Sequence, residues 1–158
     1  MIMISQIIDT NYACQLHKIL ENAFIPFTEY YTPEAFAATV VSADVFINRI
    51  STPAYSVYGA FIDNELHGTV TTKPAVNGDL YFMSMAVDPH FSGRGIGTAL
   101  LRSIEQEARN KGCPTIRLLT YEPLINAIAL YEHFGYTRTG KKVDYSGIEV
   151  FEMQLVLF

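Results

Sequence analysis

Apolar positions along the chain follow two spacings, one typical of strands and the other typical of helices. Short runs rich in apolar and β-branched residues predict strands, and apolar residues three or four positions apart predict helices. We expect strands at residues 2–8, 55–62, 65–72, 80–87, 115–120, 136–139 and 148–158. We expect helices at 10–24, 96–111 and 126–134, with one or two short helices within 33–50. This alternation predicts a single α/β domain over residues 1–158.

Local signals support several of these boundaries. Pro33 stands where a helix begins, and Ser42 is a good cap for a second short helix. Asp63 and Asn64 tolerate the left-handed backbone of a two-residue hairpin turn between two expected strands. The strand at 80–87 is apolar on both faces apart from Ser84, so we expect it near the centre of the sheet.

The helix at 96–111 has two distinct faces. Its apolar stripe contains Ile96, Leu100, Leu101, Ile104 and Ala108. Its polar positions, which we expect to face solvent, are Glu105, Gln106, Glu107, Arg109 and Lys111.

Composition narrows the class of protein. Hydrophobic residues make up 49% of the 158 positions and charged residues 17%, which excludes an intrinsically disordered chain. No apolar run reaches the roughly 18–20 residues that a membrane span needs. Residues 1–4 are apolar but lack the basic start and cleavage site of a signal peptide, so we expect a cytoplasmic protein.

Charge and cysteine content exclude further classes. The net charge is −5 and no basic stripe is visible, so we expect no nucleic-acid partner. Cys14 and Cys113 are far apart and form no metal-spaced cluster, so we expect no metal site and ordinary core thiols.

The chemically informative segment is the glycine turn, residues 92–98, with the sequence SGRGIGT. It follows an expected strand and opens an expected helix, whose first amides have no partner within the helix. Glycines let a ligand approach the backbone closely, and the helix dipole favours an anion there. Pyrophosphate is the expected ligand, with Arg94 adding charge and Thr98 a hydroxyl. A glycine-rich turn without a ligand is the plain alternative.

The spacing of the glycines argues against two other nucleotide sites. A Rossmann fingerprint reads GxGxxG, whereas this turn reads GxGxG, and it follows the fourth strand rather than the first. A P-loop needs a Lys after its last glycine, and none is present.

Residues 85–89 (MAVDP), 93–101 (GRGIGTALL) and 127–136 (AIALYEHFGY) together resemble the GNAT N-acetyltransferase superfamily. The resemblance implies a mixed, mostly antiparallel central sheet of about six or seven strands. This sheet would be splayed between strands 4 and 5 and flanked by about four helices. It also implies an acetyl-CoA cosubstrate. By match, the cofactor-binding residues are Met85, Ala86, Val87, Ser92, Gly93, Arg94, Gly95, Ile96, Gly97, Thr98 and Asn126.

The resemblance also implies direct acyl transfer, in which Tyr131 matches the family's general acid toward the leaving thiolate. A tyrosine on a short apolar helix also has a plain explanation as a core residue. Ser92 and Leu124 depart from the residues common in the family. The general base stays open among Asp79, Glu122, His133, a water chain and an amine that is already neutral.

The acceptor side is the least determined. Members of the family line the substrate pocket with the segment after the first helix and the last hairpin, here near 24–31 and 140–146. We expect Phe27, Glu29, Tyr30, Tyr31 and Ser84 to contact the substrate, with Glu29 able to hold a cationic amine. The leading hypothesis is an acetyl-CoA-dependent N-acetyltransferase acting on a small-molecule or exposed protein amine. The alternative is a non-catalytic acyl-CoA-binding regulatory domain. A homodimer through the apolar final strand is permitted.

Overall fold

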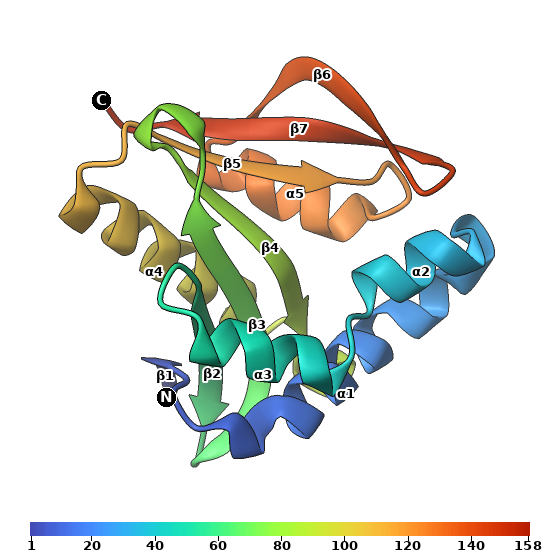
Figure 1. Ribbon diagram of the computed structural model, residues 1–158, viewed down its shortest axis with the longest axis vertical. Coiled ribbons are helices and arrows are strands. Elements are labelled where there is room, and N and C mark those ends of the chain that lie inside the picture. Colours follow the sequence, from blue (N-terminus) through green and yellow to red (C-terminus); the bar gives the residue numbers. More distant parts are fainter.

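The computed structural model describes residues 1–158 as a seven-stranded sheet with helices on both sides (Figure 1). The strands are β1 (Ile2–Gln6), β2 (Ser56–Ile62), β3 (Glu65–Pro74), β4 (Leu80–Val87), β5 (Thr115–Thr120), β6 (Thr137–Tyr145) and β7 (Ile148–Val156). The α-helices are α1 (Ala13–Phe24), α2 (Pro33–Thr39), α3 (Ala43–Ser51), α4 (Ile96–Lys111) and α5 (Ile125–Phe134). Short 3-10 segments lie at Thr10–Tyr12, Ile25–Tyr30, Val76–Gly78 and Pro89–Phe91.

The local signals in the sequence place several element ends correctly. Thr32 and Ser42 cap α2 and α3, their side chains accepting hydrogen bonds from the amides of Ala35 and Val45. The segment 33–50 therefore forms two helices, within the expected one or two, so that the fold contains five α-helices. Asp63 and Asn64 adopt φ values of 50° and 66° in the β2–β3 turn, as the hairpin prediction requires.

The strand order is β1-β2-β3-β4-β5-β7-β6, and every pair is antiparallel except β4–β5. Those two strands pair only at Leu80 with Ile116 and at Tyr81 with Arg117, so they diverge beyond that point. The mostly antiparallel sheet splayed between its fourth and fifth strands is thereby confirmed. One consequence is that β4 lacks a strand partner on its β5 side from residue 82 onward.

A β-bulge in β4 lies within this divergent stretch. Between Thr69 and Thr71 on β3, the partner register moves from Ala86 to Met83, so β4 contains one extra residue. Ser84 accommodates it with a φ of 54°, a left-handed value that is uncommon for a residue other than glycine. Bulges often re-aim side chains beside functional sites, and this one sits where the sheet opens.

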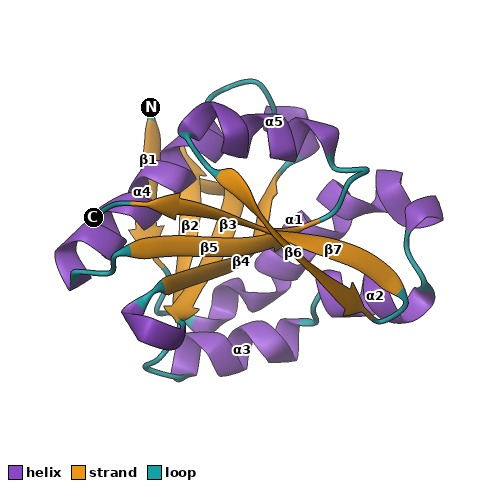
Figure 2. Cartoon of the chain, turned by 90° about the horizontal axis from the view of Figure 1, so that it is seen from above, coloured by secondary structure: helices purple, strands orange, loops and turns teal.

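Two main clusters of buried side chains hold the helices to the sheet. One joins α4 and α5 to the strands and includes Leu100, Ile104 and Phe82. The other joins α1 and α3 to the opposite face and includes Leu16 and Phe46. Figure 2 shows the strands in the middle, with α5 on one side and α3 on the other.

Three expectations from the sequence need correction. Glu107 was expected to face solvent, but it is 8% exposed because it accepts hydrogen bonds from Tyr58, Thr72 and Lys111. Cys14 was expected to be a core thiol, but it is exposed on α1, whereas Cys113 is buried. The expected loop at 140–146 is mostly strand, because β6 continues to Tyr145 after a register shift near Gly140. No helix has the length and apolar character needed to span a membrane.

Candidate active site

The glycine turn exposes a run of unpaired backbone amides. Gly93 and Gly95 adopt φ values of 77° and 83°, and Gly95 caps α4 without any side-chain hydrogen bond. The amides of residues 93–98 donate to no acceptor in the protein. A Cβ atom built at Gly93 or Gly95 would meet nothing within 4 Å, so the space above them is open. Six free N–H groups thus surround the positive end of a 16-residue helix, which suits a diphosphate.

Gly97 is needed for a different reason. A Cβ at this position would lie 2.7 Å from the Cδ2 atom of Leu130 on α5. Glycine here lets α4 and α5 approach each other, and this contact places α5 beside the turn.

A long cleft of about 540 Å³ runs from the glycine turn along the free side of β4 to α5. We call it the turn cleft. Ten of the eleven residues matched to cofactor binding line it: Met85, Ala86, Val87, Ser92, Gly93, Gly95, Ile96, Gly97, Thr98 and Asn126. Arg94 does not line it, and its guanidinium lies 4.5 Å from the ring centroid of Phe91. Phe27, expected on the acceptor side, lies on the turn cleft instead.

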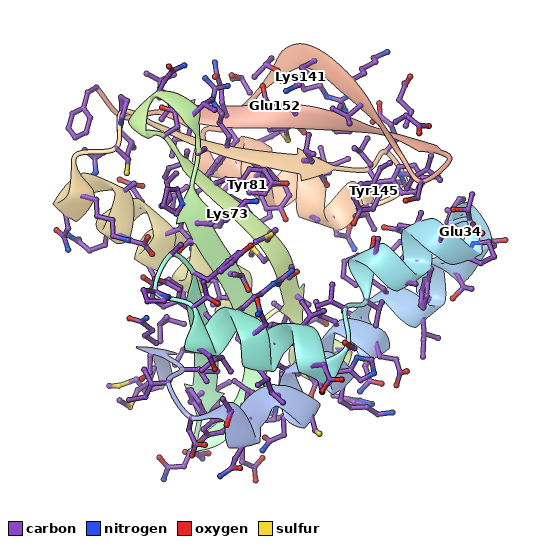
Figure 3. The ribbon with its side chains drawn as sticks, viewed as in Figure 1. Glu34, Lys73, Tyr81, Lys141, Tyr145 and Glu152 are labelled. Carbon is purple, nitrogen blue, oxygen red and sulfur yellow. The ribbon has the colours of Figure 1, made fainter.

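A second cavity of about 280 Å³ is lined by the diverging strands β4 and β5 and reaches α2, α3 and β6. We call it the aromatic pocket, because Tyr31, Tyr81, Tyr121 and Tyr145 contribute to its walls. Two cations, Arg49 and Lys73, line it as well, and no Asp, Glu or His does. In Figure 3, Lys73 and Tyr81 lie close together on β3 and β4, and the ammonium is 5.6 Å from the ring centroid.

Arg49 is the least ordinary residue of the aromatic pocket. It is 8% exposed, and its Nη1 donates to Ser84 Oγ at 2.8 Å and to Thr71 Oγ1 at 3.2 Å. No carboxylate forms an ion pair with it, and burial lowers the pKa of its guanidinium. The signal for this residue in the sequence is an arginine three positions after the buried Phe46, on the apolar stripe of α3.

The two cavities meet at four residues that line both, Phe24, Met85, Leu124 and Tyr131. Tyr131 is 6% exposed, and its ring packs edge-on against Phe82 and Tyr136. Its hydroxyl lies 4.0 Å from the Met85 sulfur. Burial raises the pKa of the Tyr131 phenol above its usual value, so the group keeps its proton at neutral pH.

Several other candidate residues from the sequence lie away from both cavities. Glu29 and Tyr30 are exposed and line neither cavity. Glu122 is held by Arg138 through contacts of 2.8 and 2.9 Å, and this pairing lowers the pKa of Glu122. His133 is exposed on α5. Tyr31 and Ser84 do line the aromatic pocket.

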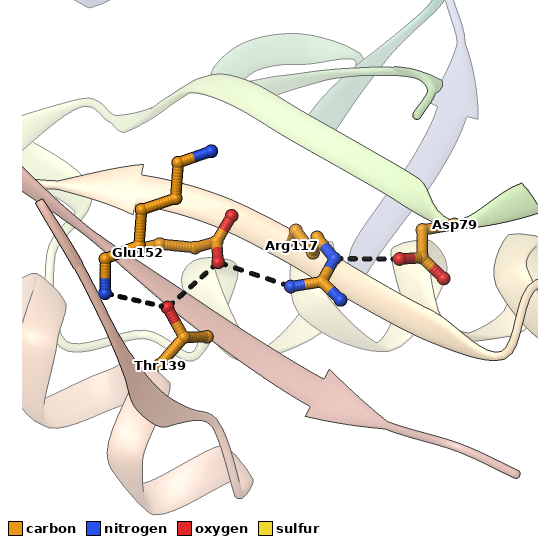
Figure 4. Close-up of polar contacts among 5 residues, drawn as sticks. Asp79, Arg117, Thr139 and Glu152 are labelled. Carbon is orange, nitrogen blue, oxygen red and sulfur yellow. Dashed lines mark hydrogen bonds and ion pairs between the residues drawn. The ribbon is translucent and has the colours of Figure 1, made fainter. Parts of the chain in front are cut away.

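The carboxylates of Asp79 and Glu152 are also engaged elsewhere. Both pair with Arg117, at 2.7 Å to Asp79 and 3.2 Å to Glu152, and Glu152 also accepts from Thr139 (Figure 4). No group of three or more His, Cys, Asp or Glu side chains is placed to bind a metal ion.

Comparison with known proteins places this arrangement in a family. The sequence profile of the acetyltransferase (GNAT) family matches residues 16–136. The chain is 32% identical over 102 residues to a probable spermine N(1)-acetyltransferase of Bacillus subtilis subsp. natto, covering 64% of this chain and 62% of that protein. It is 40% identical over 52 residues to YdhI of Bacillus subtilis, an uncharacterized protein, covering 33% and 32% of the two chains. The chain thus matches less than two thirds of the length of these relatives.

Solved structures share the fold over nearly the whole chain. The PaiA N-acetyltransferase of Thermoplasma acidophilum, determined in complex with coenzyme A, has a TM-score of 0.83 at 20% identity and covers 99% of both chains. YncA of Salmonella typhimurium, a putative acetyltransferase solved with acetyl-CoA, has a TM-score of 0.76 at 20% identity and covers 100% of this chain and 95% of its own. With the profile match over most of its length and this shared fold, the chain belongs to the GNAT acetyltransferase family.

Proposed function

We propose that the chain is an acetyl-CoA-dependent N-acetyltransferase that moves the acetyl group directly to an amine of a small molecule or an exposed protein. The observation that carries the proposal is the continuous path from six unpaired amides at the α4 start, along the free side of β4, to Tyr131. Relatives solved with coenzyme A or acetyl-CoA support the choice of donor.

The turn cleft offers CoA two kinds of contact. The pyrophosphate would accept hydrogen bonds from the amides of residues 93–98, next to the positive end of α4. The pantetheine arm contains two amide groups and would pair with the backbone of Met85, Ala86 and Val87 like an added strand. That pairing is available because β5 leaves β4 after Tyr81.

The chemistry requires a hydrogen-bond donor for the oxyanion and a proton for the leaving sulfur. A neutral amine attacks the thioester carbonyl, forming the C–N bond, and a backbone amide near Met85 or Ala86 stabilises the oxyanion. The C–S bond then breaks, and Tyr131 gives its phenolic proton to the thiolate. The extra proton on the acetylated nitrogen passes to water and restores the phenol through solvent.

No carboxylate or imidazole in either cavity is placed to deprotonate the acceptor. The aromatic pocket itself favours a neutral amine, because desolvation and the charges of Arg49 and Lys73 both lower the pKa of a bound ammonium group. The enzyme therefore takes up the amine in its neutral form without a dedicated base.

The absence of such a base also favours a second candidate, a non-catalytic domain that binds acyl-CoA for regulation. Both candidates predict acetyl-CoA binding, and only the first predicts turnover.

Calorimetry followed by a thiol-release assay tests the proposal. Acetyl-CoA should bind at one site, whereas NAD should not bind. An amine panel should then release free CoA in proportion to acetylated product, detected by mass spectrometry. Acetyl-CoA binding without turnover on any amine would favour the regulatory domain, and absence of binding would refute both candidates.

A further inference from the structure

Arg49 carries a buried positive charge that the protein does not neutralise. A buried guanidinium normally pairs with a carboxylate, since the loss of hydration is costly. Here the protein supplies two neutral hydroxyls, of Thr71 and Ser84, which both accept from the same nitrogen, Nη1, and the ring of Phe46, whose centroid lies 5.5 Å from the guanidinium carbon. Its Nε and Nη2 atoms have no hydrogen-bond partner in the protein, although the side chain lines the aromatic pocket.

The other charged residues near Arg49 add to the excess of positive charge in the aromatic pocket. Lys73 adds a second cation to the same walls, and no acidic side chain lines them. Glu152 is held by Arg117 and Thr139, and Glu34 is exposed on α2 and lines neither cavity (Figures 3 and 4). An anion in the pocket would therefore meet two cations and no repulsion. A polycation would meet two repulsive charges and no partner.

The position of Arg49 relative to the reaction centre limits the size of the ligand. Its Nη1 lies 2.8 Å from Ser84 Oγ, and the next residue, Met85, lines both cavities beside Tyr131. An anion held by Arg49 would therefore occupy the same cavity that Met85 and Tyr131 line. The volume of about 280 Å³ is at the lower end of the roughly 300–1,000 Å³ found for small-molecule sites.

We propose that the acceptor is a small amino acid-like molecule whose carboxylate binds Arg49 and whose apolar or aromatic body contacts the tyrosines of the aromatic pocket. This proposal rests on the proposed N-acetyltransferase function. Arginine holds carboxylates through paired, charge-assisted hydrogen bonds, and its two unpartnered nitrogens are suited to this. The proposed acceptor differs from spermine, the substrate in the name of the Bacillus relative.

The first experiment compares matched acceptors with acetyl-CoA as donor. L-Phenylalanine, L-tyrosine, L-leucine and L-methionine are each assayed against their amides and their decarboxylated amines, with spermine as the polycation. We expect the best free acid to exceed its amide and its decarboxylated amine in kcat/KM by at least about tenfold, the effect of losing one charged hydrogen-bonded contact. Equal or better turnover of spermine or of the amides would overturn the acceptor proposal and leave the proposed function standing.

The second experiment removes the charge. Arg49→Met should raise the KM for the free acid at least about tenfold, a larger factor than its effect on the matching amide, with acetyl-CoA affinity changed less than about twofold. Arg49→Lys should give an intermediate KM, since it keeps the charge and loses the paired donors. Arg102→Met on the exposed face of α4 is the matched control, because it deletes an arginine outside both cavities. Thermal melts establish folding, and if Arg49→Met does not fold, Lys73→Met gives the same comparison with a smaller expected rise.

Two further results bear on the proposal. Preference for succinyl-CoA over acetyl-CoA, removed by Arg49→Met, would place the anion on the donor and overturn it. Absence of acetyl-CoA binding in the wild-type protein would refute the proposed function and the acceptor class together.

Discussion

At the scale of single residues, Tyr131 has two explanations that its surroundings do not separate. Its ring packs in the core against Phe82 and Tyr136, as a structural tyrosine would. Its hydroxyl lies where the two cavities meet, as a proton donor would. A substitution that keeps the ring and removes the hydroxyl separates these roles.

We expect Tyr131→Phe to lower kcat by about a hundredfold or more, with the Kd for acetyl-CoA nearly unchanged, since only the proton transfer is lost. Steady-state kinetics and calorimetry on the same preparation measure both quantities. Tyr136→Phe is the control, because this buried tyrosine lines neither cavity. Unaltered kcat at all pH values would show that Tyr131 is a core residue only.

A negative charge on the glycine turn should repel the diphosphate. We expect Gly95→Asp to weaken acetyl-CoA binding at least about a hundredfold, through like charge and loss of the left-handed backbone that Gly95 adopts. Gly78→Asp is the matched control, since Gly78 also has a positive φ and open space but lies away from both cavities. Calorimetric titration measures the Kd of both variants for acetyl-CoA. Normal binding by Gly95→Asp would show that the diphosphate does not bind at the glycine turn.

The role of the glycine turn could be predicted from the sequence, whereas the role of Arg49 could not. Residues 92–98 form their site from consecutive backbone groups, so the sequence of this short segment is enough to predict the site. Arg49 acquires its environment from Thr71 and Ser84, which are 22 and 35 positions away. Such a site depends on tertiary contacts, and no spacing rule along the chain reveals it.

At the scale of elements, α4 contains a buried residue that the spacing of apolar positions does not predict. Its apolar stripe is buried as predicted, but the polar face includes Glu107, which lies against β2 and β3. The carboxylate of Glu107 accepts from Thr72 Oγ1 at 2.9 Å and from Lys111 at 2.9 Å, and it also accepts from the Tyr58 hydroxyl. A charged residue becomes part of the core when neighbouring strands supply donors, which a helical pattern does not show.

We expect Glu107→Ala to destabilise the fold by about 2–4 kcal/mol, because it leaves the buried Thr72 hydroxyl and the half-buried Tyr58 hydroxyl without their acceptor. Gln106→Ala on the exposed side of the same helix should cost about 0.5 kcal/mol or less. Urea unfolding followed by circular dichroism measures both. Equal midpoints for the two variants would mean that the buried carboxylate contributes nothing to stability.

The strands were predicted in type and order, but their neighbours only in part. The turn at Asp63 and Asn64 predicted the pairing of β2 with β3, and the resemblance implied the splay between β4 and β5, whereas no pattern placed β7 beside β5. The apolar character of the final segment indicated a strand, and β7 confirms it. Its position between β5 and β6 follows from pairing across the whole sheet.

At the scale of the whole molecule, several phenols resist ionisation in the folded state. Burial raises the pKa of Tyr31, Tyr58, Tyr131 and Tyr136 above the ordinary value of 10.0. In the unfolded chain these groups lose their protons as pH rises through that value, while the folded chain retains them. The unfolded state then binds fewer protons, so the free energy of unfolding falls as pH rises.

We therefore expect stability that does not depend on these phenols below about pH 9 and a steep loss above about pH 10. Thermal melts across this range, with tyrosinate absorbance recorded in parallel, check the coupling. Ionisation of these tyrosines should coincide with unfolding. Tyrosinate formation by all 10 tyrosines in a protein that keeps its native circular dichroism would contradict the prediction.

β4 and β5 pair at only two positions, so the backbone of β4 has no neighbouring strand on that side over the rest of its length. On the proposed function, the pantetheine arm of CoA takes the place of that strand, so bound CoA contributes to the stability of the folded protein. Its stability then follows mass action and grows with the ratio of CoA concentration to Kd. A cell that runs low on CoA would leave this chain less resistant to proteases, and the amount of enzyme would fall with the supply of its donor.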